Sequence, residues 1–171
     1  MRGILVVLVA AGFAGCQSLP SDAPRANATL QPTKGNKTTG TVDFYQVGNK
    51  VRVVGTVNGL VPGREHGFHV HEAGDCSSGD GMSAKGHFNP HGKPHGTPGS
   101  AERHAGDMPS LRADASGSAK VDTELDILTV TSGPASVVGR GLIVHADPDD
   151  YKTQPTGNAG ARLACAVIQR R

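Results

Sequence analysis

The sequence carries a group of side chains whose types and spacing predict a metal site. Six histidines and one aspartate make up this group: His69, His71, His87, His95, His104, Asp107 and His145. Imidazole suits zinc and copper, and a carboxylate oxygen also binds zinc. His69 and His71 alternate with apolar residues, as in a strand, so both imidazoles point to one face and can bind one ion. His104 and Asp107 lie three residues apart, a spacing that one turn of chain can fold around a second ion.

The number of donors leaves two arrangements open for a pair of ions. Two four-coordinate sites need eight ligand positions, and the group supplies seven. Either one site keeps an open position, as catalytic metals usually do, or one histidine binds both ions through its two ring nitrogens. His87 lies between the first pair of histidines and the later donors, so it is the natural candidate for a shared ligand.

The alternative interpretation is that these are ordinary surface or core histidines. An isolated His-x-His pair in a strand is more often of that kind. Here, however, seven of the eight histidines fall between residues 66 and 104, in a segment rich in Gly and Pro. A scattered set of solvated side chains would not concentrate in this way, so the clustering favours a metal site.

Short strands are expected to position these donors. Strands are expected at 41–45, 51–57, within 119–130, at 142–144 and at 163–168. Gly48-Asn49 indicates a hairpin turn between the first two, and the many Gly (24) and Pro (11) residues mark further turns. The pattern predicts an antiparallel β-sandwich or barrel with two long loops, 72–109 and 146–160. Long loops in a compact domain tend to be functional, and the first loop carries most of the donors.

Length and composition exclude some classes of function. The 171 residues suggest one domain with a sizeable core. The formal net charge is only +2, and four Phe, two Tyr and no Trp leave little surface for stacking bases. Nucleic acid is therefore not an expected partner.

The N-terminus predicts export. Residues 1–15 have one Arg followed by a run of apolar and small residues that is too short to span a bilayer, as in a signal peptide. Residues 13–16 (FAGC) resemble the bacterial lipobox, which predicts a lipid on Cys16 after cleavage; a plain secretory signal is the alternative. Residues 16–28 then form the lipidated N-terminus and a flexible tether, and 29–171 form the folded domain. The expected location is the bacterial cell envelope, in the periplasm or on the outer membrane, with a membrane anchor through the lipid.

Several segments resemble the signature sequences of the copper/zinc superoxide dismutases, in particular the bacterial periplasmic or lipoprotein type. They are 67–72 (GFHVHE), 86–90 (GHFNP), 93–96 (KPHG), 102–107 (ERHAGD), 139–145 (GRGLIVH) and 156–165 (TGNAGARLAC). The resemblance covers about residues 28 to 169. It implies an all-β fold, a flattened eight-stranded Greek-key barrel of the immunoglobulin-like sandwich kind, for which this family is itself a known example.

The resemblance also implies roles for individual residues. His69, His71, His87 and His145 match the copper ligands, and His87, His95, His104 and Asp107 match the zinc ligands, so His87 would be shared. Arg162 matches the arginine that guides the anion beside copper. Asp149 best matches an aspartate that links ligands of the two metals, with Asp147 and Asp150 close by. His66 is expected to be a hydrogen-bonded structural residue, and His91 a solvated loop residue.

Cys76 and Cys165 match the intrasubunit disulfide of the family. Lipidation of Cys16 would leave these two as a pair among the three cysteines, and a disulfide persists in an oxidising compartment. The departure from the family is the Gly/Ser-rich stretch 76–87, which is similar to the bacterial version of this loop.

The implied activity is the dismutation of superoxide to dioxygen and hydrogen peroxide. In this mechanism a redox-cycling copper exchanges electrons with superoxide, His87 releases copper and takes a proton, and one copper and one zinc are bound per subunit. The competing interpretation is a metal-buffering or metal-donating lipoprotein on the same fold, which would lack a copper ligand or Arg162. Because both are present, the enzyme is favoured. The resemblance also allows a homodimer, since bacterial members differ in oligomeric state.

Overall fold

The computed structural model describes residues 23–171 of the chain. The expected signal peptide, 1–15, and the expected lipid attachment point, Cys16, lie outside these residues and stay predictions. Between residues 23 and 171 no helix is both long and apolar enough to cross a membrane.

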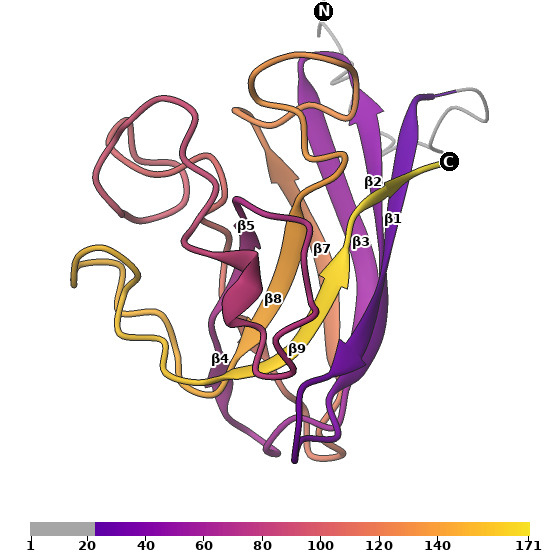
Figure 1. Ribbon diagram of the computed structural model, residues 1–171, viewed down its shortest axis with the longest axis vertical. Coiled ribbons are helices and arrows are strands. Elements are labelled where there is room, and N and C mark those ends of the chain that lie inside the picture. Colours follow the sequence, from indigo (N-terminus) through magenta and orange to yellow (C-terminus); the bar gives the residue numbers. More distant parts are fainter. Residues whose placement is uncertain (1–22) are drawn as a thin grey trace, which may run out of the picture.

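One curled antiparallel sheet dominates the described residues (Figure 1). Its members are β1 (Arg25–Pro32), β2 (Thr39–Val47), β3 (Lys50–Asn58), β5 (Phe68–His71), β7 (Ala119–Leu125), β8 (Gly141–His145), β9 (Arg162–Val167) and β10 (Gln169–Arg170). The order is β5-β8-β9-β1-β2-β3-β7, with β10 beside β1. A second pair, β4 (Glu65–His66) and β6 (Leu111–Arg112), contacts β7 through β6. Because β5 pairs with β8 and not with a sequence neighbour, the chain crosses over as a Greek key requires, and the expected all-β fold is confirmed.

The β2–β3 hairpin follows directly from its sequence. Val42 and Phe44 on β2 and Val53 on β3 point into the core and alternate with partly or fully exposed residues. Gly48 begins the turn with a φ of 58°, a conformation that glycine adopts freely. The expected strand within 119–130 ends earlier than its pattern indicates, at Leu125, where the chain bends.

The folded domain begins earlier in the chain than the sequence predicts. Residues 25–28, expected to be part of a flexible tether, lie in β1 and pair with β2. Ala26, Ala28 and Leu30 are fully or almost fully buried on one face of β1. The sequence signal is weak because alanine fills the core here in place of the larger β-branched residues that mark strands.

Strands β5 and β8 are buried on both faces, and this burial positions the donors. On the inner face Phe68, Val70, Leu142 and Val144 join the main hydrophobic core. On the outer face lie Ile143 and the histidines, beneath two long loops. One loop runs from β5 to β6 and contains only the short 3-10 helix η1 (Met82–Ala84), and the other runs from β8 to β9. The two expected long loops are therefore present, and they leave the sheet after His71 at the end of β5 and after His145 at the end of β8. Figure 1 shows the two loops on the same side of the sheet.

Candidate metal centre

The β5–β8 pair supplies three of the expected ligands. His69 and His71 lie on the outer face of β5, and His145 ends β8. Gly141 is the register partner of His71 on β8. A Cβ atom at Gly141 would lie 2.6 Å from the carbonyl oxygen of Ala73, so only glycine allows the loop to pass this close to the strand. The backbone thereby brings the first long loop over the two histidines.

His69, His71, His87 and His145 form what we call the four-histidine set. Each residue is buried and offers one ring nitrogen, and these nitrogens all lie within 4.8 Å of one another. Nε2 of His71 lies 3.3 Å from Nε2 of His145. His87 comes from the long loop and joins through a bridge between its backbone and that of His71. Four imidazoles from two strands and one loop therefore converge on one point.

His87, His95, His104 and Asp107 form what we call the aspartate set. Their donor atoms also lie within 4.8 Å of one another, and all four residues are buried. Oδ1 of Asp107 lies 2.8 Å from Nδ1 of His87, 3.0 Å from Nδ1 of His95 and 3.4 Å from Nδ1 of His104. Oδ2 accepts hydrogen bonds from the backbone N–H groups of Gly96 and His104. The turn from His104 to Asp107 thus holds the carboxylate among the three imidazoles.

The donor chemistry of both sets fits metal ions. Tetrahedral ligands at the usual zinc distances lie about 3.3 Å from one another, which matches the separations around Asp107. Nδ1 of His69 and Nε2 of His87 are buried and lack a hydrogen-bond partner among the described residues. Buried polar nitrogens are costly to leave unpaired, and a metal ion in the four-histidine set would satisfy both.

His87 is the residue that the two sets share. Its Nδ1 faces Asp107, while its Nε2, on the other side of the ring, belongs with the four-histidine set. The ring centroid lies 4.0 Å from that of His69. Of the two arrangements that the donor count allowed, the geometry therefore favours the shared histidine.

Asp149 also connects the two sets, in addition to the shared His87. Its Oδ2 accepts a hydrogen bond from Nε2 of His69 at 2.7 Å, and its Oδ1 accepts one from Nε2 of His95 at 2.9 Å. Gly157 packs against this carboxylate so closely that a Cβ atom there would overlap Oδ1. Asp147 and Asp150 do not make this link: Asp147 lies 3.7 Å from Arg64, and Asp150 caps the turn at Lys152 and Thr153.

Hydrogen bonds to backbone carbonyl groups orient the two remaining imidazoles of the four-histidine set, those of His71 and His145. Nδ1 of His71 donates to the carbonyl oxygen of Lys85 at 2.8 Å, and Nδ1 of His145 lies 3.3 Å from the carbonyl oxygen of Gly160. A donor N–H on one side of the ring leaves a lone pair on the other nitrogen, which is the form that binds metal. Each ring in the four-histidine set is therefore turned with its free nitrogen toward the centre.

Electrostatics keep most of the imidazoles neutral and the carboxylates charged. Burial and the neighbouring imidazoles lower the pKa of His71 and of His145 well below 6.5. Burial also lowers the pKa of His87 to about 4, although its hydrogen bond to Asp107 opposes the shift. Burial alone would raise the pKa of Asp107, but hydrogen bonds from His104, His87 and His95 hold it far below its usual range. These are the protonation states that metal ligands require.

His95 is the exception among the imidazoles. Burial lowers its pKa, but hydrogen bonds to Asp107 and Asp149 outweigh that effect and raise the pKa to about 9. The same interaction, together with the bond from His69, holds the pKa of Asp149 below its usual range against the effect of burial. A proton on His95 thus occupies the place that a metal ion would take between these groups.

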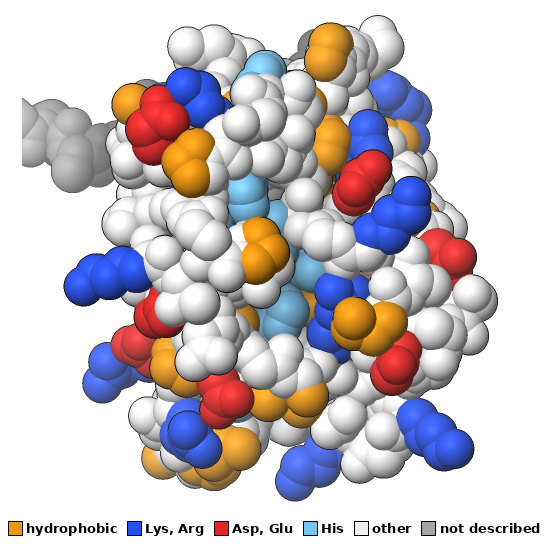
Figure 2. All heavy atoms as spheres, turned by 60° about the vertical axis from the view of Figure 1, so that its left-hand side comes forward, with side chains coloured by type: hydrophobic (Ala, Val, Ile, Leu, Met, Phe, Trp, Pro, Cys, Tyr) orange, Lys and Arg blue, Asp and Glu red, His pale blue; other side chains and the backbone are white. Residues whose placement is uncertain are grey.

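Arg162 borders the four-histidine set at the start of β9. Its Nη1 donates to the carbonyl oxygen of Gly81 and its Nη2 to that of Lys85, each at 2.5 Å. Carbonyl groups, not carboxylates, hold the guanidinium, so no described residue neutralises its charge in an ion pair. Figure 2 shows histidine side chains at the bottom of an opening between the loops, with Lys or Arg side chains beside it.

A disulfide fixes the loop that carries Gly81 and Lys85. Cys76 and Cys165 are bonded across 89 residues, which ties the first long loop to β9. Cys165 packs with Ile143 and with Ala84 of η1 in a small apolar cluster on the outer face of the sheet. The expected disulfide is confirmed, and it lies close to Arg162 in the sequence.

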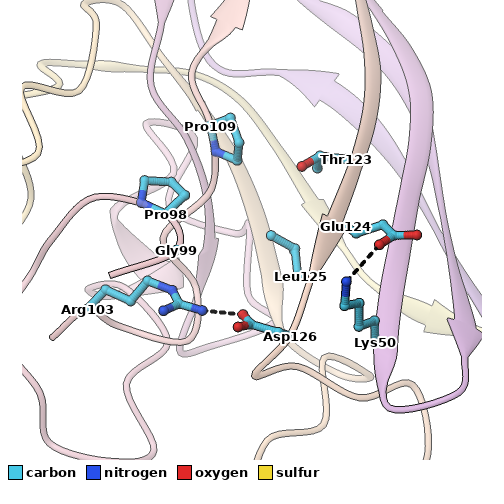
Figure 3. Close-up of a pocket in the computed structure, with 9 residues that line it drawn as sticks. All are labelled: Lys50, Pro98, Gly99, Arg103, Pro109, Thr123, Glu124, Leu125 and Asp126. Carbon is cyan, nitrogen blue, oxygen red and sulfur yellow. Dashed lines mark hydrogen bonds and ion pairs between the residues drawn. The ribbon is translucent and has the colours of Figure 1, made fainter. Parts of the chain in front are cut away.

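Arg103 is a functional candidate that the sequence pattern did not single out. Its side chain is only 8% exposed, and it donates to the carboxylate of Asp126 and to the carbonyl oxygen of Ser100. Figure 3 shows Arg103 reaching from the long loop to Asp126 after β7, beside a cavity of about 330 Å³. This contact holds the part of the loop next to His104 against the end of β7. Its signal in the sequence is an arginine directly before a predicted ligand, and only the structure shows that this arginine is buried.

The two remaining histidines lie outside both sets. His66 is fully buried, and its Nδ1 is 2.9 Å from the carbonyl oxygen of His145, so it packs behind a residue of the four-histidine set. His91 is exposed on the long loop. Both placements agree with what the sequence suggested for these residues.

Comparisons with known proteins agree with this geometry. Residues 38–168 match the family model for copper/zinc superoxide dismutase (SODC). The chain is 38% identical over 176 residues to "Superoxide dismutase [Cu-Zn] 2" of Aquifex aeolicus (strain VF5), covering 99% of this chain and 98% of that relative. It is 39% identical over 173 residues to "Extracellular superoxide dismutase [Cu-Zn]" of Caenorhabditis elegans, covering 95% and 76%. A crystal structure of the clock protein EA4 superposes with a TM-score of 0.79 at 39% identity, covering 90% of this chain and 98% of that one.

Proposed function

Because the chain belongs to the copper/zinc superoxide dismutase family, we propose that its two side-chain sets divide the two metals between them. The protein dismutates superoxide with copper and zinc: two superoxide anions and two protons give one dioxygen and one hydrogen peroxide. The proposal assigns this activity to individual residues.

In this proposal the four-histidine set binds copper and the aspartate set binds zinc. Imidazole nitrogens alone suit copper, whereas a tetrahedral site with three histidines and a carboxylate suits zinc. His87 belongs to both sets, so it would hold copper with Nε2 and zinc with Nδ1. The observation that carries the proposal is the position of His87, whose two nitrogens face the two sets.

The chain's own residues do the rest of the chemistry. Copper supplies one-electron redox chemistry, and zinc supplies fixed charge without changing its oxidation state. Arg162 attracts superoxide and orients it with its donors beside the four-histidine set. Nε2 of His87, when it is not bound to copper, would supply one of the two protons that the reduced anion takes up. Asp149 holds the imidazoles of His69 and His95 in place during this cycle.

Metal content in single variants tests the division of the two metals. His145→Ala removes a ligand of the four-histidine set only, and should lose copper while it keeps zinc. His104→Ala removes a ligand of the aspartate set only, and should lose zinc first. His91→Ala, an exposed histidine outside both sets, is the control and should keep both metals. Elemental analysis after loading decides, and loss of the opposite metal in either variant would contradict the assignment.

We further propose that the protein is exported and anchored in the cell envelope by a lipid on Cys16. The Cys76–Cys165 disulfide supports export, since disulfides persist in oxidising compartments. Two relatives also support this proposal, one named extracellular and one from a bacterium. In this division residues 1–15 are a signal peptide, and the sheet starts at Arg25. The finer location, periplasm or outer membrane, follows from the lipobox-like segment 13–16, and a possible homodimer follows from the resemblance to the family.

Membrane fractionation tests the anchor. Cys16→Ser removes the thiol that would carry the lipid and should release the protein from membranes, whereas the control Ser18→Ala should leave it bound. Unchanged membrane association of Cys16→Ser would exclude the lipid anchor. Sedimentation of a soluble form over a range of concentrations decides between monomer and homodimer.

A further inference from the structure

Lys85 has a backbone conformation that a lysine rarely adopts. Its φ is 63° and its ψ is −149°, a region that is essentially reserved for glycine because a Cβ atom clashes there. Tyr151 and Asn158 are the other non-glycine residues with positive φ in the described part of the chain. A strained residue persists only where its surroundings hold it, and such residues concentrate at functional sites. Lys85 directly follows η1 on the long loop.

The carbonyl oxygen of Lys85 explains why the backbone is held this way. It accepts a hydrogen bond from Nδ1 of His71 at 2.8 Å and another from Nη2 of Arg162 at 2.5 Å. The N–H of Lys85 donates to the carbonyl oxygen of Met82 at 3.0 Å. One peptide group thus connects a ligand of the four-histidine set to the cation beside it. Glycine would supply the same carbonyl without the strain, so the lysine side chain needs a separate reason.

That reason is positive charge beside the opening. The side chain of Lys85 is exposed, and it forms no ion pair with a residue in 23–171. The carbonyl oxygen of Lys85 accepts a hydrogen bond from the guanidinium of Arg162, so the lysine side chain leaves the backbone next to that group. The acidic group that acts on Arg162 is Asp80, whose charge opposes the lowering of the Arg162 pKa by burial. A second cation therefore strengthens the field that an incoming anion meets.

We propose that Lys85 is a specificity-determining residue that draws superoxide toward Arg162, with its charge placed at a position that backbone geometry would assign to glycine. This inference rests on the proposed function of the four-histidine set. It makes Lys85 an anion-attracting residue and not a ligand, because the exposed side chain lies outside both sets of donors.

Four substitutions in the full metal-loaded protein separate charge from backbone strain. Lys85→Gln removes the charge and keeps the strain, Lys85→Gly removes both, Lys85→Arg keeps both, and Lys85→Glu reverses the charge. Lys120→Gln is the matched control, since Lys120 is an exposed lysine on β7, at the far end of the sheet order from β5. All five should bind copper and zinc like the parent protein.

The first readout is the rate of superoxide consumption at several salt concentrations. Lys85→Gln and Lys85→Gly should lower kcat/KM roughly two- to fivefold at low salt, and the loss should shrink as salt screens the charge. Lys85→Glu should lose more, while Lys85→Arg and Lys120→Gln should stay near the parent rate. The proposal would be overturned if Lys85→Gln and Lys85→Gly consumed superoxide at the parent rate. It would also be overturned if Lys120→Gln or Lys85→Arg lost as much activity as Lys85→Gln.

Two readouts do not depend on turnover. Azide is a small anion that serves as a binding probe: its affinity for the copper-loaded protein, followed by absorption, should fall in Lys85→Gln and not in Lys120→Gln. Thermal unfolding should show a higher Tm for Lys85→Gly than for Lys85→Gln, because glycine adopts the observed φ without cost. Equal Tm values would refute the strain, and unchanged azide affinity would refute the charge effect. A parent protein that binds both metals but consumes no superoxide would instead refute the proposed function, and azide would still test Lys85.

Discussion

Nε2 of His69 lies 2.7 Å from Oδ2 of Asp149, although 80 positions of sequence separate the two residues. The other oxygen of this carboxylate accepts a hydrogen bond from His95. Asp149 therefore fixes the orientation of one imidazole in the four-histidine set and one in the aspartate set. Together with His87, it connects the two sets of donors, so we expect a change in either set to affect the other.

Asp149→Asn should weaken metal binding while leaving the β-fold intact. An amide offers one acceptor oxygen and one donor group, so it cannot accept hydrogen bonds from both His69 and His95. At least one ring then loses the partner that keeps its metal-facing nitrogen unprotonated, and affinity should fall about 10- to 100-fold. Competition with a chelator measures the loss. Asp150→Asn, which changes a turn cap and not this link, is the control, and equal affinities in both variants would contradict the role of Asp149.

Substitutions at Arg162 should reduce activity without removing metal. Arg162→Ala keeps every ligand but loses the charge and the donors, and we expect the rate to fall on the order of tenfold or more. Arg162→Lys should lie between the parent and Ala, and Arg162→Glu should be the slowest. Rates are compared at equal copper and zinc content. Equal rates for Lys, Ala and Glu would mean that Arg162 has no part in the reaction and would favour the metal-buffer interpretation.

Removing the disulfide should destabilise the protein and loosen the loop beside Arg162. The double variant Cys76→Ala with Cys165→Ala should lose about 2–5 kcal/mol of unfolding free energy, since the bond closes a long loop in the unfolded chain. Urea unfolding of the metal-loaded protein measures this. We expect the activity at low temperature to fall as well, because Gly81 and Lys85, which hold Arg162, lie on the released loop. Unchanged stability would contradict a structural role for the bond.

The stability of the metal-free protein should be greatest near pH 6.5. The pKa of His87 is lowered to about 4, so the unfolded chain binds more protons below 6.5 and stability falls as the pH drops toward 4. The pKa of His95 is raised to about 9, so its contribution is complete below 6.5 and is lost as the pH rises through 9. Thermal unfolding from pH 4.5 to 9.5 tests both directions. His95→Gln should abolish the alkaline loss, and a profile unaffected by this change would contradict the prediction.

The contact between Arg103 and Asp126 should stabilise the loop that carries His104. Arg103→Met leaves the partners of a buried cation unpaired and should cost about 1–3 kcal/mol, with faster release of zinc to a chelator. Asp126→Asn should cost less, about 1 kcal/mol or below, because the Asp126 side chain is 59% exposed to solvent. Arg112→Met is the control, since its ion pair with Glu65 lies in solvent. Equal zinc release in all three would rule out this role for Arg103.

Much of the fold and of the candidate site could be predicted because the signals are local. The alternation around His69 and His71 fixes which face of a strand they share, and Gly48-Asn49 fixes a hairpin. The two long loops follow from the absence of any periodic pattern between strands. The donor count reduced the metal arrangement to two choices, the place of His87 among the donors made it the candidate for a shared ligand, and the resemblance to a family agreed.

The rest depends on contacts between distant parts of the chain. Strand β1 was not expected, because the alanines that bury it carry little strand signal. The ion pair of Arg103 with Asp126 and the shared carbonyl of Lys85 join segments that no local pattern relates. Backbone carbonyls in particular leave no trace in residue type, so their role in holding Arg162 and His71 appears only in three dimensions.

The most direct test of the whole account uses one sample of the chain lacking residues 1–16, loaded with copper and zinc. Elemental analysis and the rate of superoxide consumption are measured on that same sample. We predict one copper and one zinc per chain, together with catalytic consumption of superoxide that slows as salt is added. Zinc alone after copper loading with intact histidines, or full occupancy of both metals without superoxide consumption, would contradict it.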